Sequence, residues 1–187
     1  MGITLERKKI YIVLTSTRTM LARAIRLCAK ETYNHVSISL DKELNEMYCF
    51  GRRSPRNPFI AGFIKEDWDK GFYAVYKNIP CLVYECEVDD EVYNNIKGII
   101  EYFYSNKFSY KFNIIGLVGN GIGLDIQRKN RYYCAEFLSY LFEESGFYSF
   151  NEAHTRRRPM DYKEFLNSKL IYNGYISEYK HKCEQLI

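Results

Sequence analysis

Cysteine and histidine are the residue types in this sequence whose surroundings could support covalent catalysis. One of the six cysteines, Cys134, lies in the run RYYCAEFLSYLFEESG, where apolar residues recur at the three-and-four spacing of an amphipathic helix. We expect Cys134 at the first turn of that helix, where unpaired backbone N–H groups and the positive end of the dipole favour a thiolate. The same N–H groups would stabilise an oxyanion on a substrate carbonyl. The alternative is a small buried cysteine that only packs in the core.

A nucleophilic cysteine needs a base, and the three histidines are the candidates. His181 lies in a charged segment and is expected to be exposed, and His154 lies beside three arginines whose positive field would reduce its basicity. His35 stands at the start of the alternating run YNHVSISLD, which is typical of a strand and can hold an imidazole in place. We therefore expect His35 to be the base; a packed, hydrogen-bonded structural histidine is the alternative.

The elements that would position these residues follow from hydrophobic periodicity and turn signals. Strands are predicted at 9–15, 33–41, 46–51 and 81–88, with a closing strand or hairpin at 170–179. Helices are predicted at 18–30, from 89 or 90 to 105, after Cys134, and briefly from Pro159. The second and third strands are expected to form a hairpin. The aromatic segment 59–76 has no assignable structure and is expected to be a lid, a groove wall or a surface excursion.

Length and composition limit the domain organisation and the partners. A chain of 187 residues is long enough for one well-packed core, so we predict a single domain over 1–187. The aromatic share of 17% indicates a core and a groove lined with aromatic rings. The net charge of +4 is too small to indicate a nucleic-acid partner.

Metal and cofactor motifs were sought among the cysteines and glycines. The cysteines form no CxxC pair, which argues against a zinc ribbon or a thioredoxin-type motif. The four glycines between 116 and 123 do not follow the GxGxxG spacing, and no P-loop lysine follows them, so we expect flexible backbone there. No cofactor or metal is expected. The absence of a signal core or a membrane span in the sequence favours reduced thiols and a cytoplasmic location.

The order of these segments resembles the circularly permuted papain-like amidases of the NlpC type, which are related to the lecithin:retinol acyltransferase group. The resemblance lies in YNHVSISLD, its hairpin partner, and YYCAEFL at a helix start much later, because the permuted group places the histidine strand before the cysteine helix. It extends from Tyr11 to Asp161. It implies an α+β, permuted papain-like fold in which an antiparallel sheet packs against helices and the cysteine begins one of them.

The resemblance also implies roles for particular residues. Cys134 would be the nucleophile, and His35 the general base and acid. Relatives carry a third polar residue, commonly Glu, His or Asn, on the strand after the histidine. The best-matching position here holds Cys49, and Glu46 is the nearest carboxylate. Tyr110 matches a tyrosine that relatives place near the cysteine, where it would aid the oxyanion or hold substrate; one more packed aromatic residue is the alternative.

The implied function is a cysteine hydrolase that cleaves an amide, peptide-like or derived from cell wall, or an ester. Its substrate would be a small molecule, a peptide or a lipid, and the basic segments Arg52–Arg56 and Arg156–Arg158 would suit a carboxylate or phosphate on it. Two alternatives stay open at this stage. One is a lipid-directed acyltransferase or thioesterase with 59–76 as a lid that excludes water. The other is a non-catalytic binding module, which the departure at the third position favours.

Overall fold

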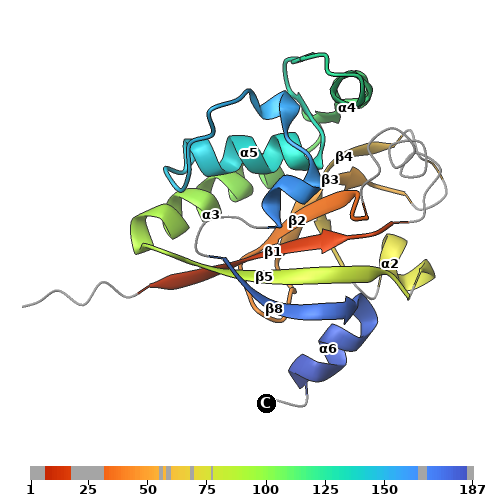
Figure 1. Ribbon diagram of the computed structural model, residues 1–187, viewed down its shortest axis with the longest axis vertical. Coiled ribbons are helices and arrows are strands. Elements are labelled where there is room, and N and C mark those ends of the chain that lie inside the picture. Colours follow the sequence, from red (N-terminus) through yellow and green to blue (C-terminus); the bar gives the residue numbers. More distant parts are fainter. Residues whose placement is uncertain are drawn as a thin grey trace, which may run out of the picture.

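An antiparallel sheet of six strands forms the centre of the fold, with helices packed on it (Figure 1). The computed structural model describes residues 7–17, 32–54, 57, 60–67, 70–76, 78–163 and 168–184. In sheet order the strands are β4 (Ala61–Glu66), β3 (Met47–Arg52), β2 (His35–Ser39), β1 (Lys8–Thr15), β5 (Pro80–Val88) and β8 (Ser168–Tyr175). A short parallel pair comprises β6 (Lys111–Phe112) and β7 (Arg131–Tyr132).

The helices are distributed over both faces of the sheet. In Figure 1, α3 (Asp90–Ser105) and α5 (Cys134–Glu144) lie on one face, whereas α6 (Ile176–Glu184) lies beside β8 on the opposite side. The short helix α2 (Gly71–Val75) follows β4, and α4 (Ile114–Gly121) projects from the body of the molecule. Two 3-10 turns, η1 (His154–Arg156) and η2 (Pro159–Tyr162), follow α5.

The core has two parts because both faces of the central strand are covered. In β1, the side chains of Ile10, Ile12 and Leu14 pack in the cluster that contains the residues of α3 and α5. The intervening residues Tyr11 and Val13 pack in a second cluster with residues of α2 and α6. Alternate residues of a strand point to opposite faces, so a strand covered on both faces is apolar throughout.

Helix α5, which begins at Cys134, is held by an apolar face that the sequence periodicity predicts. Its members Phe137, Leu138, Leu141 and Phe142 are all buried. Gly146 follows the helix with a φ of 75°, the left-handed conformation that ends many helices. The buried face holds the helix against the core. Cys134 is its first residue and so lies among the first backbone N–H groups of the helix.

Comparison with the sequence predictions confirms an α+β fold with an antiparallel sheet against helices. The predicted strands at 9–15, 33–41, 46–51 and 81–88 correspond to β1, β2, β3 and β5, and the predicted helices at 89–105 and after Cys134 to α3 and α5. The predicted helix 18–30 lies outside the described residues. Segment 59–76 contains β4 and α2, and the glycine-rich segment forms α4 rather than irregular flexible backbone.

The C-terminal part is one strand followed by a helix rather than a single closing strand or hairpin. Ile176, Tyr179 and Cys183 of α6 are buried at helical spacing and pack in the second core cluster. Within the described residues, no helix has the length and apolar character required to cross a membrane.

Candidate active site

A histidine–glutamate pair forms the centre of the candidate site. His35, the first residue of β2, has its Nε2 atom 3.1 Å from Oε1 of Glu66, the last residue of β4. The two side chains are 14% and 8% exposed. Strand β3 lies between β2 and β4 in the sheet, so the pair spans two strand spacings along one face.

Two hydroxyl groups hold the Glu66 carboxylate in place. Ser37 donates to Oε2 of Glu66, and its Oγ also lies 3.2 Å from Nε2 of His35. The Tyr73 hydroxyl, from α2, donates to Oε1 of Glu66 at 3.2 Å. His35 and Ser37 are two residues apart on one strand and therefore point to the same face. Both carboxylate oxygens are thus hydrogen-bonded, which a buried carboxylate requires.

The electrostatics of the pair favour an imidazolium beside a carboxylate. Burial alone would lower the pKa of His35, but its neighbours Cys49 and Glu66 and a hydrogen bond with Cys134 raise that pKa well above its ordinary value. Burial raises the pKa of Cys49 to about 12, so Cys49 is a neutral thiol near pH 7 and Glu66 supplies the negative charge. Burial would also raise the pKa of Glu66, but the charge of His35 and the hydrogen bonds outweigh it and lower that pKa.

Cys134 also contacts the imidazole. It is the first residue of α5, is 6% exposed and lines the same pocket as His35. Its thiol hydrogen-bonds the His35 side chain. Glu66 and Ser37 contact Nε2 of the ring, and the imidazole is also hydrogen-bonded to Cys49. The arrangement provides a nucleophile, a base and a group that orients the base.

The start of α5 is fixed by a buried carboxylate. Glu136 accepts from the backbone N–H of Tyr133 at 3.1 Å and from Nδ2 of Asn113 at 3.2 Å. Burial raises the pKa of Glu136 to about 7, against the opposing effect of these hydrogen bonds. The carboxylate therefore joins the first turn of α5 to the start of α4, whose N-terminal cap is Asn113.

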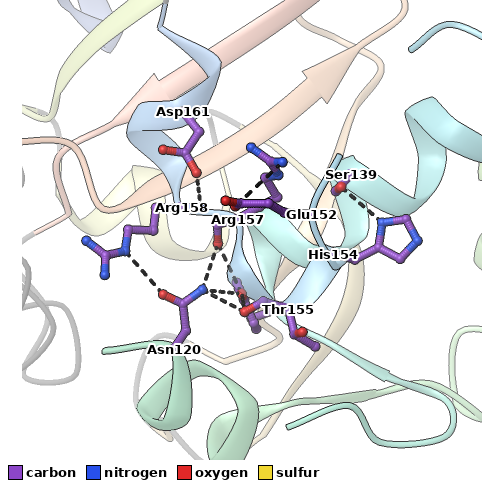
Figure 2. Close-up of polar contacts among 9 residues, drawn as sticks. Asn120, Ser139, Glu152, His154, Thr155, Arg157, Arg158 and Asp161 are labelled. Atoms are coloured by element: carbon purple, nitrogen blue, oxygen red, sulfur yellow. Dashed lines mark hydrogen bonds and ion pairs between the residues drawn. The ribbon is translucent and has the colours of Figure 1, made fainter. Parts of the chain in front are cut away.

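A second set of hydrogen bonds ties the same helix start to the segment after α5. The Tyr133 hydroxyl donates to the carbonyl oxygen of Thr155 at 2.6 Å. Asn120 donates to the carbonyl oxygens of Thr155 and Arg157 at 2.7 and 3.2 Å, and its side-chain oxygen accepts from Nε of Arg158 (Figure 2). The position of Cys134 thus depends on α4, on η1 and on the segment between η1 and η2.

The pocket around Cys134 and His35 has a volume of about 240 Å³ and two kinds of lining. Its apolar wall comprises Phe50, Ala61, Ile64, Phe112 and Leu117, and its basic side chains are Arg52, Arg53, Lys65 and Lys70. The Arg53 guanidinium is engaged with the backbone carbonyls of Lys107 and Tyr110. Lys70 is ion-paired with Asp67, another lining residue, at 3.3 Å. Arg52 and Lys65 are the candidates for contact with an anionic part of a ligand.

The second basic segment of the sequence lies elsewhere. Arg157 stacks on the Phe150 ring, 4.4 Å from its centroid, and Arg158 donates to Asn120. Neither is among the described residues that line the pocket, although the adjacent Pro159 is. In the first basic segment, Arg56 lies outside the described residues.

The structure brings three of the five sequence-predicted residues together. His35, Cys134 and Cys49 are neighbours, and the Cys49 sulfur lies within 4.8 Å of ligand atoms of His35 and Glu66. Glu46 is exposed before β3, and its backbone N–H donates to Asp41. Met47 pairs with Ser39, four residues along β2 from His35, so Glu46 is at the far end of the hairpin. The hairpin register therefore keeps the Glu46 carboxylate away from His35.

Tyr110 is packed away from the pocket lining. Its ring stacks on Phe103 with centroids 4.2 Å apart, and its hydroxyl hydrogen-bonds Tyr102. The other two histidines do not supply the base in the described structure of the pocket: neither is among its described lining residues. His154 contacts Ser139 and Glu143, each at 3.0 Å, and the side chain of His181 lies outside the described part of the structure.

Glu66 is the functional candidate that sequence reasoning missed. It ends β4, in the segment to which no structure was assigned, one strand beyond the hairpin where the third residue was sought. A weak signal is present: Phe63 is buried in the core, whereas Ile64 and Glu66 line the pocket, the alternation of a half-buried strand. Gly62 and the surrounding aromatic residues obscure this period.

His35, Cys49 and Glu66 also have the donor types that zinc uses, with their ligand atoms within 4.8 Å of one another. However, Nε2 of His35 contacts the Glu66 carboxylate directly, and the hydroxyls of Ser37 and Tyr73 donate to it. These contacts already satisfy the atoms that would ligate an ion, so the geometry is that of an ion pair.

Comparison with known proteins adds no assignment. No family model matches the chain, and no curated protein matches it. The function must therefore be argued from the contacts of Cys134, His35 and Glu66.

Proposed function

We propose that the protein is a cysteine hydrolase of the permuted papain-like type that cleaves an amide or ester bond. One observation carries the proposal: the buried imidazole of His35 contacts both the Glu66 carboxylate and the Cys134 thiol. A nucleophile, a base and an orienting carboxylate in hydrogen-bond contact are the parts that a covalent hydrolase requires.

The reaction follows from these contacts. In the reactive form the Cys134 proton is already on His35, so a thiolate lies beside an imidazolium, and this thiolate adds to the substrate carbonyl carbon. The oxyanion accepts hydrogen bonds from the first backbone N–H groups of α5, which have no acceptor within the helix. The His35 imidazolium then protonates the leaving amine or alkoxide as its bond to the carbonyl carbon breaks. This step leaves a thioester on Cys134.

Water completes the cycle. His35, now neutral, removes a proton from a water molecule, which adds to the thioester carbonyl; collapse releases the acid and returns the thiol. Glu66 takes no proton in this scheme. It orients the ring and stabilises its positive charge, the role of the carboxylate in a serine protease triad.

Support for the permuted family comes from the chain order and from Glu66. The histidine strand precedes the cysteine helix; the strand belongs to an antiparallel sheet, and the helix packs on that sheet. The third polar group is a carboxylate, as the resemblance leads us to expect, but it comes from β4 instead of β3. Cys49, on β3, lies beside the pair as a neutral thiol.

The pocket lining favours a substrate with an apolar portion and an anionic group. The apolar wall would hold the first, and Arg52 and Lys65 would contact the second. A second candidate, acyl transfer to an amine or alcohol, is favoured by the burial of Cys134, which is only 6% exposed and would shield a thioester from water. Product analysis with and without an added amine acceptor separates transfer from hydrolysis.

Labelling with a cysteine-directed electrophile at neutral pH tests the proposal. We expect rapid modification of Cys134 in the wild type, loss of labelling in Cys134→Ser, and strongly slowed labelling in His35→Ala. Cys86→Ser is the matched control, because burial raises the pKa of Cys86 to about 12 and its neutral thiol should not react. Circular dichroism checks that each variant folds.

Mass spectrometry of the labelled peptide identifies the modified cysteine. Modification at Cys49 instead of Cys134, or undiminished labelling of Cys134 in folded His35→Ala, would contradict the proposal. A panel of peptide amides, aryl esters and acyl thioesters then shows which bond is cleaved, and Cys134→Ser should cleave none of them.

A further inference from the structure

Helix α4 presents most of its large apolar side chains to the outside; Leu117, which is packed against the core, is the exception. The outward residues Ile115, Val118 and Ile122, the last at the helix end, are 52, 55 and 68% exposed. The inward residues are Gly116, Gly119 and Asn120, all buried. A surface helix normally turns its polar face to water, so α4 has the reverse orientation.

This orientation is imposed by close packing. A Cβ atom on Gly116 would overlap the Asn113 side chain and lie 2.8 Å from the carbonyl oxygen of Ile126. One on Gly119 would lie 2.9 Å from the Ile126 side chain. The glycine face therefore packs against residues 113 and 126, and Ile115, Val118 and Ile122 point outward.

The outward side chains form one continuous feature, here called the apolar ridge. It comprises Ile114, Ile115, Val118, Ile122 and Leu124, each at least 36% exposed. The spacing of three and four residues from 114 to 122 aligns them along one side of the helix. Grouped exposed apolar residues of this kind mark interaction surfaces in soluble proteins.

Basic residues precede and follow the ridge in the sequence. This basic border comprises Lys111, Arg128, Lys129 and Arg131. Lys111 and Arg131 are paired between β6 and β7, and Arg128 is bridged to Arg131, so the two ends meet in space. The acidic residue between them, Asp125, accepts a hydrogen bond from Thr155. The combined surface is apolar and cationic.

We propose that the apolar ridge and the basic border dock on an anionic lipid bilayer, with the ridge in the headgroup region. Apolar residues flanked by lysine and arginine are the composition of surface-bound helices, and anionic lipids supply the opposite charge. Charge also argues against a second copy of the chain, because a symmetric interface would bring the two basic borders into one contact.

The proposal concerns a surface and does not rest on the hydrolase chemistry. It does have a consequence for access to the pocket. Leu117, on the same helix, lines the pocket that contains Cys134. Docking of α4 would therefore bring the pocket next to the lipid surface.

Co-sedimentation of the full chain with vesicles provides the test. We expect the wild type to bind phosphatidylcholine vesicles that contain phosphatidylserine, to bind pure phosphatidylcholine vesicles much less, and to be released by added salt. Ile115→Asp combined with Ile122→Asp should weaken binding by roughly tenfold or more. Lys111→Gln combined with Lys129→Gln should remove most of the dependence on phosphatidylserine.

Leu170→Asp combined with Tyr175→Asp is the matched control. These residues are 46 and 44% exposed on β8, at the opposite edge of the sheet from β4, and their replacement should leave vesicle binding unchanged. Circular dichroism and a thermal melt establish that the ridge variant is folded. Cys134→Ser should bind vesicles like the wild type, so an absence of hydrolysis would not affect this result.

Three results would overturn the proposal. The first is a wild type that does not bind vesicles with phosphatidylserine, and the second is equal loss of binding in the ridge variant and the β8 control. The third is a wild type that dimerises without binding vesicles and that becomes monomeric in the ridge variant, which would assign the ridge to a second copy.

Discussion

Replacement of Glu66 by glutamine is the sharpest test of how the site works. The change keeps the size of the side chain and removes the negative charge beside His35. The bond affected is a charge-assisted contact of 3.1 Å between side chains that are 14% and 8% exposed. Hydrogen bonds to charged groups contribute about 1.5–3 kcal/mol. Because about 1.36 kcal/mol corresponds to a tenfold change in rate, we expect turnover to fall roughly 10- to 150-fold.

The pH profile should change in a defined direction. Glu66 is one of the groups that raise the pKa of His35, so its neutralisation should lower that pKa. The imidazolium that protonates the leaving group is lost as the pH rises through this pKa. The alkaline limb of the turnover profile should therefore begin at a lower pH in Glu66→Gln than in the wild type. A purely structural role for Glu66 would lower activity without this shift.

Glu46→Gln is the matched control, since the same chemical change is made at an exposed carboxylate at the far end of the hairpin. It should leave both the rate and the profile unchanged. The assay is turnover of the best substrate from the panel, or the alkylation rate of Cys134, measured across pH with folded protein. A Glu66→Gln variant with the wild-type rate and alkaline limb, or a Glu46→Gln variant that reproduces the loss, would refute the reasoning.

Two further predictions concern stability. Burial raises the pKa of Glu136 to about 7 from 4.5, so between these pH values the folded state binds a proton that the unfolded state releases. The free energy of unfolding should therefore fall by up to about 3 kcal/mol as pH rises through this window. Thermal melts at pH 5 and 8 should show this fall in the wild type and not in Glu136→Gln. Gly116→Ala should lower the free energy of unfolding, measured in urea, by about 1–3 kcal/mol. Gly98→Ala on α3 is the control: an added Cβ meets nothing within 4 Å there, so this variant should be more stable by up to about 1 kcal/mol. Equal effects of the two substitutions would contradict the packing argument.

The sequence predicted the elements whose periodicity is local. Strand β1 and helices α3 and α5 each carry a regular apolar pattern, and each lies close to its predicted bounds. The helix start at Cys134 was predictable because the pattern begins there. The pairing of Cys134 with His35 was expected because a nucleophilic cysteine needs a base, and the family resemblance implied it too; no local pattern encodes a contact between residues so far apart.

The parts that were missed depend on contacts distant in sequence. Strand β4 has only a weak alternating pattern in the sequence. It is held as a strand by its pairing with β3, in which Ile64 lies opposite Cys49. Helix α4 is rich in glycine, which disfavours helices, but Asn113 caps it by accepting from the Gly116 N–H at 3.0 Å. Its glycines then allow the close approach to Ile126. The third residue of the candidate site was misplaced for the same reason, since Glu66 reaches His35 across an intervening strand.

The hydrogen-bond network at Asn120 affects which mutations this protein tolerates. Tyr133, immediately before Cys134, and Asn120 both bind the carbonyl oxygens of Thr155 and Arg157. The segment at Thr155 and Arg157, 21 and 23 residues beyond the nucleophile in the sequence, therefore holds Cys134 in place. Insertions or proline substitutions in this segment should displace the Cys134 sulfur and leave the imidazole and the pocket walls in place. Such mutations would abolish turnover without preventing a ligand from binding.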